Sequence, residues 1–119
     1  MMPDPVPVGA NPDLAKLHSD LVALVATLDK AVGTATTKSQ VIALLDEISD
    51  VNARVNMVGR QLFTQQTAEI TKAASKVEAA IPDIEKAIAD LDKLQDFING
   101  MTKFLKLVDQ VLAVAKVVI

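Results

Sequence analysis

The carboxyl-terminal stretch, residues 97–119, constrains the fold more than any other part of the chain. It holds 15 apolar residues against four charged ones, which are Lys103, Lys106, Asp109 and Lys116. On a helical wheel these charges gather on one ridge about 140° wide, and the rest of the wheel is apolar. The apolar arc divides into two seams, and a helix with two apolar seams packs against two neighbours. The stretch therefore predicts a helix buried on two sides.

The composition of the whole chain favours an aliphatic helical core. Half of the 119 residues are apolar, and the three aromatic residues are all Phe. RNA and single-stranded DNA are bound on aromatic platforms beside basic surfaces, whereas this chain has no Trp or Tyr and a net charge of −3. The absence of Cys excludes disulfides and thiolate chemistry. We expect no nucleic-acid partner.

A first helix is predicted over residues 12–32. Asn11 is a suitable N-cap, Pro12 suits the first helical position, and Asp13 faces the positive end of the helix dipole. Gly33 ends the helix. The seam follows three-four spacing and consists of Leu14, Leu17, Leu21, Leu24, Leu28 and Ala31.

A second helix is predicted from Lys38 to about Ala80. Thr37 and Gln40 fit the capping box at its start. The apolar seam slips by one position after Leu62, as in a coiled-coil stutter, and no Gly or Pro lies between residues 60 and 81. We expect one helix of roughly 65 Å at 1.5 Å per residue.

A third helix is predicted over residues 82–119. Pro82 should end the second helix because a proline pushes the preceding residue out of the helical region, although a kink instead of a reversal stays open. Asn99 and Gly100 form a turn signal, but the seam keeps its phase across them, which favours one helix with at most a kink. That seam consists of Ile84, Ile88, Leu91, Leu94, Ile98, Met101, Leu105, Val108, Leu112, Ala115 and Ile119.

These elements predict an all-α fold, an antiparallel three-helix up-down-up bundle. The second and third helices are longer than the first, so they should extend beyond it as a two-helix coiled-coil arm with its tip near residues 80–83. Residues 12–119 form the bundle. Residues 1–11 contain Pro3, Pro5 and Pro7 and are expected to form an extended arm that is mobile or loosely docked.

No set of side chains in the sequence signals catalysis, a cofactor or a metal. His18 is the only histidine and has no signalled carboxylate or nucleophile beside it, so packing or solvation is the favoured role. Asp46, Glu47 and Asp50 could offer oxygen ligands to a hard cation, but di-metal bundles need Glu-x-x-His motifs, and none occurs. We expect no enzyme activity, no cofactor, no metal and no small-molecule substrate.

Some polar residues carry two interpretations. The acidic stretch over residues 83–96 should pair with the basic segment over residues 54–76 across the predicted arm, and an acidic docking face is the alternative. Asn52 and Asn56 lie near the apolar arc of the second helix, where a buried Asn fixes register or oligomeric state, and an exposed edge position is equally compatible. Gly59 would allow close helix approach, which is a weak signal alone.

The favoured function is a non-enzymatic helical interaction module that acts through self-association or docking on a protein partner. A lipid- or apolar-surface-binding protein, pore-former-like or coat-like, is the alternative, with the C-terminal amphipathic helix at the interface. No classical signal peptide or transmembrane stretch is recognisable, so a cytoplasmic location is the default. The interaction surface is expected at Phe97, Phe104, Leu107, Val111, Val114, Val117, Val118 and Ile119.

Overall fold

A computed structural model describes residues 9–115 of the chain. In this range the chain is all-α, with four helices: α1 (Pro12–Val32), α2 (Lys38–Arg60), α3 (Ala68–Ala89) and α4 (Leu94–Ala115). The expectation of a three-helix bundle is therefore wrong. The connection predicted at Pro82 falls at another place in the sequence, and a further connection, at residues 61–67, was not predicted.

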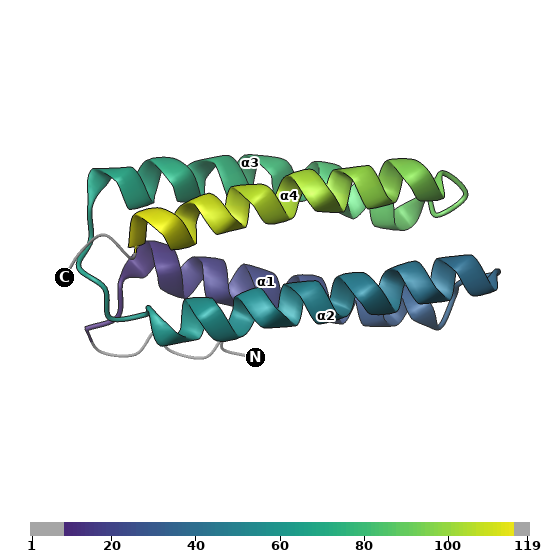
Figure 1. The fold of residues 1–119 in the computed structure, drawn as a ribbon, viewed down its shortest axis with the longest axis horizontal. Coiled ribbons are helices and arrows are strands. Elements are labelled where there is room, and N and C mark those ends of the chain that lie inside the picture. Colours follow the sequence, from purple (N-terminus) through teal and green to yellow (C-terminus); the bar gives the residue numbers. More distant parts are fainter. Residues whose placement is uncertain (1–8, 116–119) are drawn as a thin grey trace, which may run out of the picture.

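The four helices form two antiparallel hairpins that are stacked on each other (Figure 1). α1 packs on α2 and α3 packs on α4, while smaller contacts join α1 to α3 and α2 to α4. Because the chain runs up, down, up and down, each contact between the hairpins joins two parallel helices. The molecule measures 45 × 31 × 20 Å. The expected two-helix arm is absent from the described residues, because each helix packs along two of the other three.

α1 begins and ends where its sequence signals predicted. Asn11 Oδ1 accepts hydrogen bonds from the backbone N–H groups of Asp13 and Leu14, at 3.0 and 3.1 Å. The C-cap is Gly33, in the right-handed conformation. Every residue of the predicted seam is buried, namely Leu14, Leu17, Leu21, Leu24, Leu28 and Ala31. The capping residues and the spacing of the apolar residues were sufficient to predict the bounds and the buried side of α1, because both depend only on residues that are close in the sequence.

The second predicted helix is broken at residues 61–67. α2 starts with the predicted capping box of Thr37 and Gln40, but it ends at Arg60 with Gln61 as the C-cap. Thr67 then caps α3 by accepting a hydrogen bond from the Ile70 N–H at 3.2 Å. The slip of the seam after Leu62 is thus a helix break and not a stutter. The polar run 64–67 offers a helix no side chain to bury, and its threonine serves as a cap instead.

Pro82 lies inside α3 and does not end a helix. A proline here removes the N–H that would bond to the carbonyl of residue 78, at a cost of about 3 kcal/mol in a helix interior. Both Pro82 and Glu78 are exposed, so water reaches the freed carbonyl. The seam stays in phase on both sides, with Val77, Ile84 and Ile88 buried. Burial of this seam offsets the lost hydrogen bond.

The reversal that the sequence assigned to Pro82 occurs at residues 90–93 instead. There Lys93 N–H donates to the Asp90 carbonyl at 3.2 Å, and α4 begins at Leu94. The predicted helix over residues 82–119 is therefore split between α3 and α4. Asn99 and Gly100 lie within α4, so the turn signal at this pair does not end the helix.

A buried amide at each end of the bundle ties the two hairpins together. At one end, Asn11 N–H donates to the Leu62 carbonyl at 2.6 Å, and Asn11 Nδ2 donates to the Thr64 carbonyl at 3.2 Å. At the other end, Gln40 Nε2 donates to the Leu91 carbonyl at 3.1 Å. Both residues are buried. Between these ties lies the core, whose largest fully buried side chains include Phe97, Phe104, Leu14, Leu21, Leu28, Leu44, Ile70 and Met101.

Candidate interaction surface

Most of the residues predicted to form the interaction surface lie inside the bundle. Phe97, Phe104 and Val111 are buried, at 0, 2 and 0 % exposure. Leu107 and Val114 are half-buried against the same core. Val117, Val118 and Ile119 lie outside the described residues. A partner could reach the two phenylalanines only if the hairpins separated, so the accessible apolar surface must be sought elsewhere.

The exposed large apolar side chains belong to the first half of the molecule. Val22 of α1 is 48 % exposed, and Ile42, Leu45 and Met57 of α2 are 50, 51 and 45 % exposed. Phe63, in the loop that follows, is 66 % exposed. The described parts of α3 and α4 contribute no exposed large apolar residue. Apolar surface is therefore confined to the α1–α2 hairpin and its outgoing loop.

Several of these residues fall on a second heptad seam along each helix. On α1, residues spaced alternately by four and three positions form one line along the helix, from Ala15 to Asp29. On α2, residues spaced alternately by three and four positions form a second line, from Ile42 to Asn56. All residues on the two lines are exposed except Ala15, which is half-buried, and Asp29 is the only charged residue among them. We call these ten residues the outer face; they are Ala15, Ser19, Val22, Ala26, Asp29, Ile42, Leu45, Ser49, Asn52 and Asn56.

The contact between His18 and Gly59 places both lines on one side of the hairpin. A Cβ atom at Gly59 would lie 3.7 Å from His18 Nε2, so the imidazole covers this glycine. Val22 follows His18 by four residues, and Asn56 precedes Gly59 by three, so both lie beside the contact on their helices. His18 thus serves in helix packing, and Gly59 is the place where another helix comes close. The exposed Asn52 and Asn56 occupy the edge position that was one of their two interpretations.

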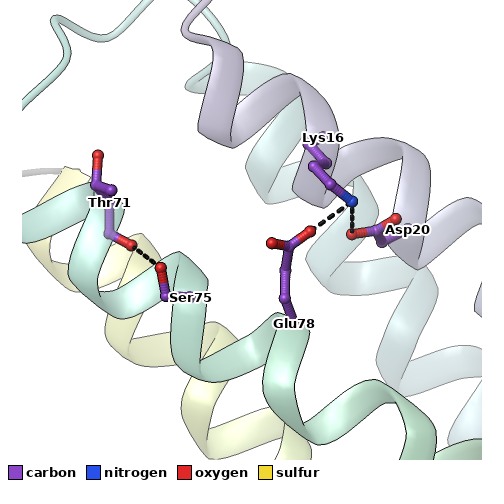
Figure 2. A network of polar contacts seen from close by, with 5 residues as sticks. All are labelled: Lys16, Asp20, Thr71, Ser75 and Glu78. Carbon is purple, nitrogen blue, oxygen red and sulfur yellow. Dashed lines mark hydrogen bonds and ion pairs between the residues drawn. The ribbon is translucent and has the colours of Figure 1, made fainter.

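The α1–α3 contact contains a network of polar side chains (Figure 2). Lys16 Nζ contacts Asp20 Oδ2 at 3.3 Å and also pairs with Glu78 Oε1. The hydrogen bonds that Lys16 donates to Glu78, the larger cause, and to Asp20 raise the pKa of Lys16. One turn toward the end of the bundle, Thr71 Oγ1 donates to Asp13 Oδ2 at 2.7 Å. Alternating acceptors and donors therefore hold the parallel helices together.

The cleft beside this network has a volume of about 210 Å³. Leu24, Ile84 and Phe104 form its apolar floor, and all three are buried. The carboxylates of Asp20 and Glu85 stand at its rims, one on each helix. The cleft is thus apolar within and acidic at its edges.

The α2–α4 contact contains a bidentate ion pair and a buried acid. Arg54 Nε and Nη2 donate to the two carboxylate oxygens of Asp109 at 3.1 and 3.0 Å. Two turns away on α2, Glu47 is only 8 % exposed, and its Oε2 atom has no hydrogen-bond partner in the described residues. Burial, together with the nearby charges of Asp50 and Asp46, raises the pKa of Glu47 to about 7, against the opposing effect of Arg54. Sequence reasoning missed this burial, although Glu47 follows Leu44 at a three-residue interval on the buried seam.

The acidic residues considered as oxygen ligands do not form a metal-binding cluster in the described residues. Asp46 and Asp50 are exposed, and no cluster of three or more potential metal ligands occurs within residues 9–115. The pairing expected between residues 54–76 and 83–96 is replaced in the case of Arg54, whose partner is Asp109. In the same range, none of the helices combines the length and apolar character needed to cross a membrane.

Comparison with known proteins gives no match: no family model, no curated protein and no solved structure resembles this chain significantly. Its function must therefore be argued from the residues and the surfaces described above.

Proposed function

We propose that this protein is a non-enzymatic helical interaction module that self-associates through the outer face of α1 and α2. One observation carries the proposal. In the described residues, three large apolar side chains of the outer face, Val22, Ile42 and Leu45, are exposed, a fourth exposed one, Met57, lies on the α4 side of α2, and α3 and α4 expose none. An apolar patch confined to one side of a small bundle is typical of a protein interaction site.

A second copy of the chain is the partner that suits this face best. The face carries one charge among ten residues, so it offers little electrostatic selection for a charged partner. Its two lines follow heptad spacing, and such seams pack against similar seams. Two helices about 30 Å long and 8–10 Å apart present roughly 600 Å². Two copies would bury about 1,200 Å², the lower limit for a standard interface.

The small and amide side chains of the outer face would give the dimer its specificity. Ala15, Ser19 and Ala26 permit close approach of helices because they add little bulk. Asn52 lies between Ser49 and Asn56 on the α2 line, and an Asn at a heptad seam position selects register and oligomeric state at some cost in stability. The proposal therefore predicts a discrete dimer instead of open-ended association.

Sedimentation velocity over a range of protein concentrations tests the proposal. We expect the unmodified chain to dimerise and Leu45→Asp to weaken dimerisation at least 30-fold, because the new carboxylate loses its water at the interface. Ala79→Asp, which places the same charge on the exposed side of α3, is the matched control and should dimerise normally. Circular dichroism should show equal helix content in all three proteins.

Two results would contradict self-association through this face. One is an unmodified chain that stays monomeric at millimolar concentration, and the other is equal weakening by Leu45→Asp and Ala79→Asp. The lipid-binding hypothesis stays a prediction, and no specific observation in the described residues favours it, because the apolar side of α4 is packed inside the bundle.

A further inference from the structure

We propose that the groove between α1 and α3 is a second docking site, which receives a basic amphipathic helix of a protein partner. This groove lies on the opposite side of α1 from α2. It is separate from the outer face, and the proposal does not depend on self-association.

The rims of the groove carry acidic residues at a regular interval. On α1, Asp13 and Asp20 are seven residues apart, and on α3, Glu78 and Glu85 have the same separation. Seven residues make two helical turns, which is about 10.5 Å. Because α1 and α3 are parallel, the two pairs run in the same direction along the groove. The spacing matches that of the flanking positions in a coiled coil, where charged side chains choose the partner.

The charge of the groove is not balanced within the described residues. Lys16 is its only cation and is shared between Asp20 and Glu78 (Figure 2). Asp13 accepts hydrogen bonds from the neutral side chains of Thr71 and Gln66, and Glu85 forms no ion pair in residues 9–115. Four carboxylates and one ammonium leave a net charge of −3 on this strip. A partner with Lys or Arg at the same interval would complement it.

The floor between the rims explains why the partner should also be apolar. The cleft of about 210 Å³ is lined below by Leu24, Ile84 and Phe104, and Ala23 and Thr27 leave its mouth open. This volume accommodates one or two aliphatic side chains of a docked helix, not a drug-sized ligand, for which pockets of at least about 300 Å³ are usual. An apolar floor between acidic rims is the complement of a helix with an apolar seam flanked by basic residues.

A labelled synthetic helix provides the test. The probe is an 18-residue fluorescein-labelled peptide with Leu and Ala on its seam and Lys at the flanking positions; the comparison peptide has Glu in place of Lys. Fluorescence anisotropy with the full chain should show binding of the Lys peptide only. This binding should weaken at least tenfold between low salt and 300 mM salt, because screening acts on exposed ion pairs.

Two sets of protein variants locate the binding. Asp20→Asn combined with Glu85→Gln should weaken binding of the Lys peptide at least tenfold. Asp83→Asn combined with Glu69→Gln removes the same charge from exposed positions outside the groove and should change binding less than twofold. Ala23→Leu, which fills the mouth of the cleft without changing charge, should weaken binding as the rim variant does. Leu45→Asp should leave it unchanged, since the outer face is not involved.

Three outcomes would overturn the docking proposal. The first is equal binding of the Lys and Glu peptides, and the second is equal weakening by the rim variant and its control. The third is a nuclear magnetic resonance map in which the Lys peptide shifts amides outside residues 13–27 and 71–85. Failure of dimerisation in the sedimentation experiment would leave all three readouts interpretable.

Discussion

The hairpins α1–α2 and α3–α4 have almost the same helix lengths and the same antiparallel pairing, but they differ in what they leave in water. The first exposes Val22, Ile42, Leu45 and Met57, whereas the exposed positions of α3 are mostly charged or small. On α3 three of the four half-buried apolar positions beside the core are Ala73, Ala80 and Ala87, at seven-residue intervals, and the fourth is Ile81. Small side chains at the three alanine positions allow α3 to pack closely and add no large apolar side chain to the surface in contact with water. Two hairpins of the same architecture therefore differ in their exposed side chains: the first exposes large apolar residues, and the described part of the second does not.

The difference has a counterpart in charge. The first hairpin has an outer face with one charged residue, while α3 alone exposes Glu69, Lys72, Lys76, Glu78 and several further charges. Exposed mixed charge keeps a surface solvated and discourages association. The comparison supports the proposal that the outer face of α1 and α2 contacts a protein, whereas the charged positions of α3 outside the α1–α3 groove stay in water.

The largest expected effect comes from removing bulk inside the second hairpin. Phe104 is 2 % exposed and touches both the core and the α1–α3 cleft, so Phe104→Ala should lower the free energy of unfolding by about 3–5 kcal/mol. Urea denaturation followed by circular dichroism measures this. A loss below 1 kcal/mol would mean that α4 does not bury this side chain. Leu45→Ala, a truncation on the exposed outer face, is the comparison variant and should change the stability of the monomer far less.

The next largest effect is the pH dependence that Glu47 gives to the contact between the hairpins. Its pKa is raised from 4.5 to about 7, so the folded state prefers the protonated acid. The stability from this preference is fully present below pH 4.5 and is lost as the pH rises through 7, up to about 3 kcal/mol. Glu47→Gln should therefore be more stable than the unmodified chain at pH 8.5 and nearly equal to it at pH 4.5.

Denaturation at both pH values, with the exposed Glu69→Gln as the control, tests this prediction. The control should follow the unmodified chain at both pH values. If Glu47→Gln shows the same pH dependence as the unmodified chain, the carboxyl is hydrated in solution and the α2–α4 contact is looser than described.

Pro82 gives a smaller effect, and its substitution should stabilise the fold. Pro82→Ala restores a backbone N–H opposite the carbonyl of residue 78 in an exposed stretch of α3, and it should raise the free energy of unfolding by about 1–2 kcal/mol. Part of the gain is offset, because alanine leaves the unfolded chain more flexible. The measurement is the thermal midpoint, with the exposed Ala79→Ser as a control for surface substitution on the same helix. No gain would indicate that α3 is already distorted at this point.

The smallest effect on folding is expected at the outer face itself. Leu45 is 51 % exposed, so Leu45→Ala should change the stability of the monomer by less than about 0.5 kcal/mol at low protein concentration. At high concentration the same change should lower the thermal midpoint, because it weakens a dimer that stabilises the fold by mass action. A loss of stability that does not depend on concentration would place Leu45 in the core and would contradict the comparison of the two hairpins.

Local signals in the sequence predicted a good part of the fold. The N-cap at Asn11, the capping box at Thr37 and the three-four spacing of α1 all have the roles expected of them. Each depends on residues within one or two turns, and such interactions are read directly from sequence. The candidate interaction surface was harder to predict. The outer face is a second seam on α1 and α2, whose main seam is buried. Because both seams contain apolar residues, the sequence alone does not show which of them is exposed.

Three properties follow from the residues alone: the chain is helical, α1 runs from Pro12 to Val32, and the leucine seam of α1 is buried. The reversals at residues 61–67 and 90–93 depend on how the helices pack. A helix through residues 61–67 or 90–93 satisfies its own backbone as well as a turn does, and Pro82 is a poor helix residue by any local measure. The choice depends on burial, because turning at 61–67 and 90–93 stacks two short hairpins and buries Phe97, Met101 and Phe104 between them. The apolar side of residues 97–115 is thus accounted for by the chain's own core, and the proposed partner surfaces are the outer face of α1 and α2 and the groove between α1 and α3.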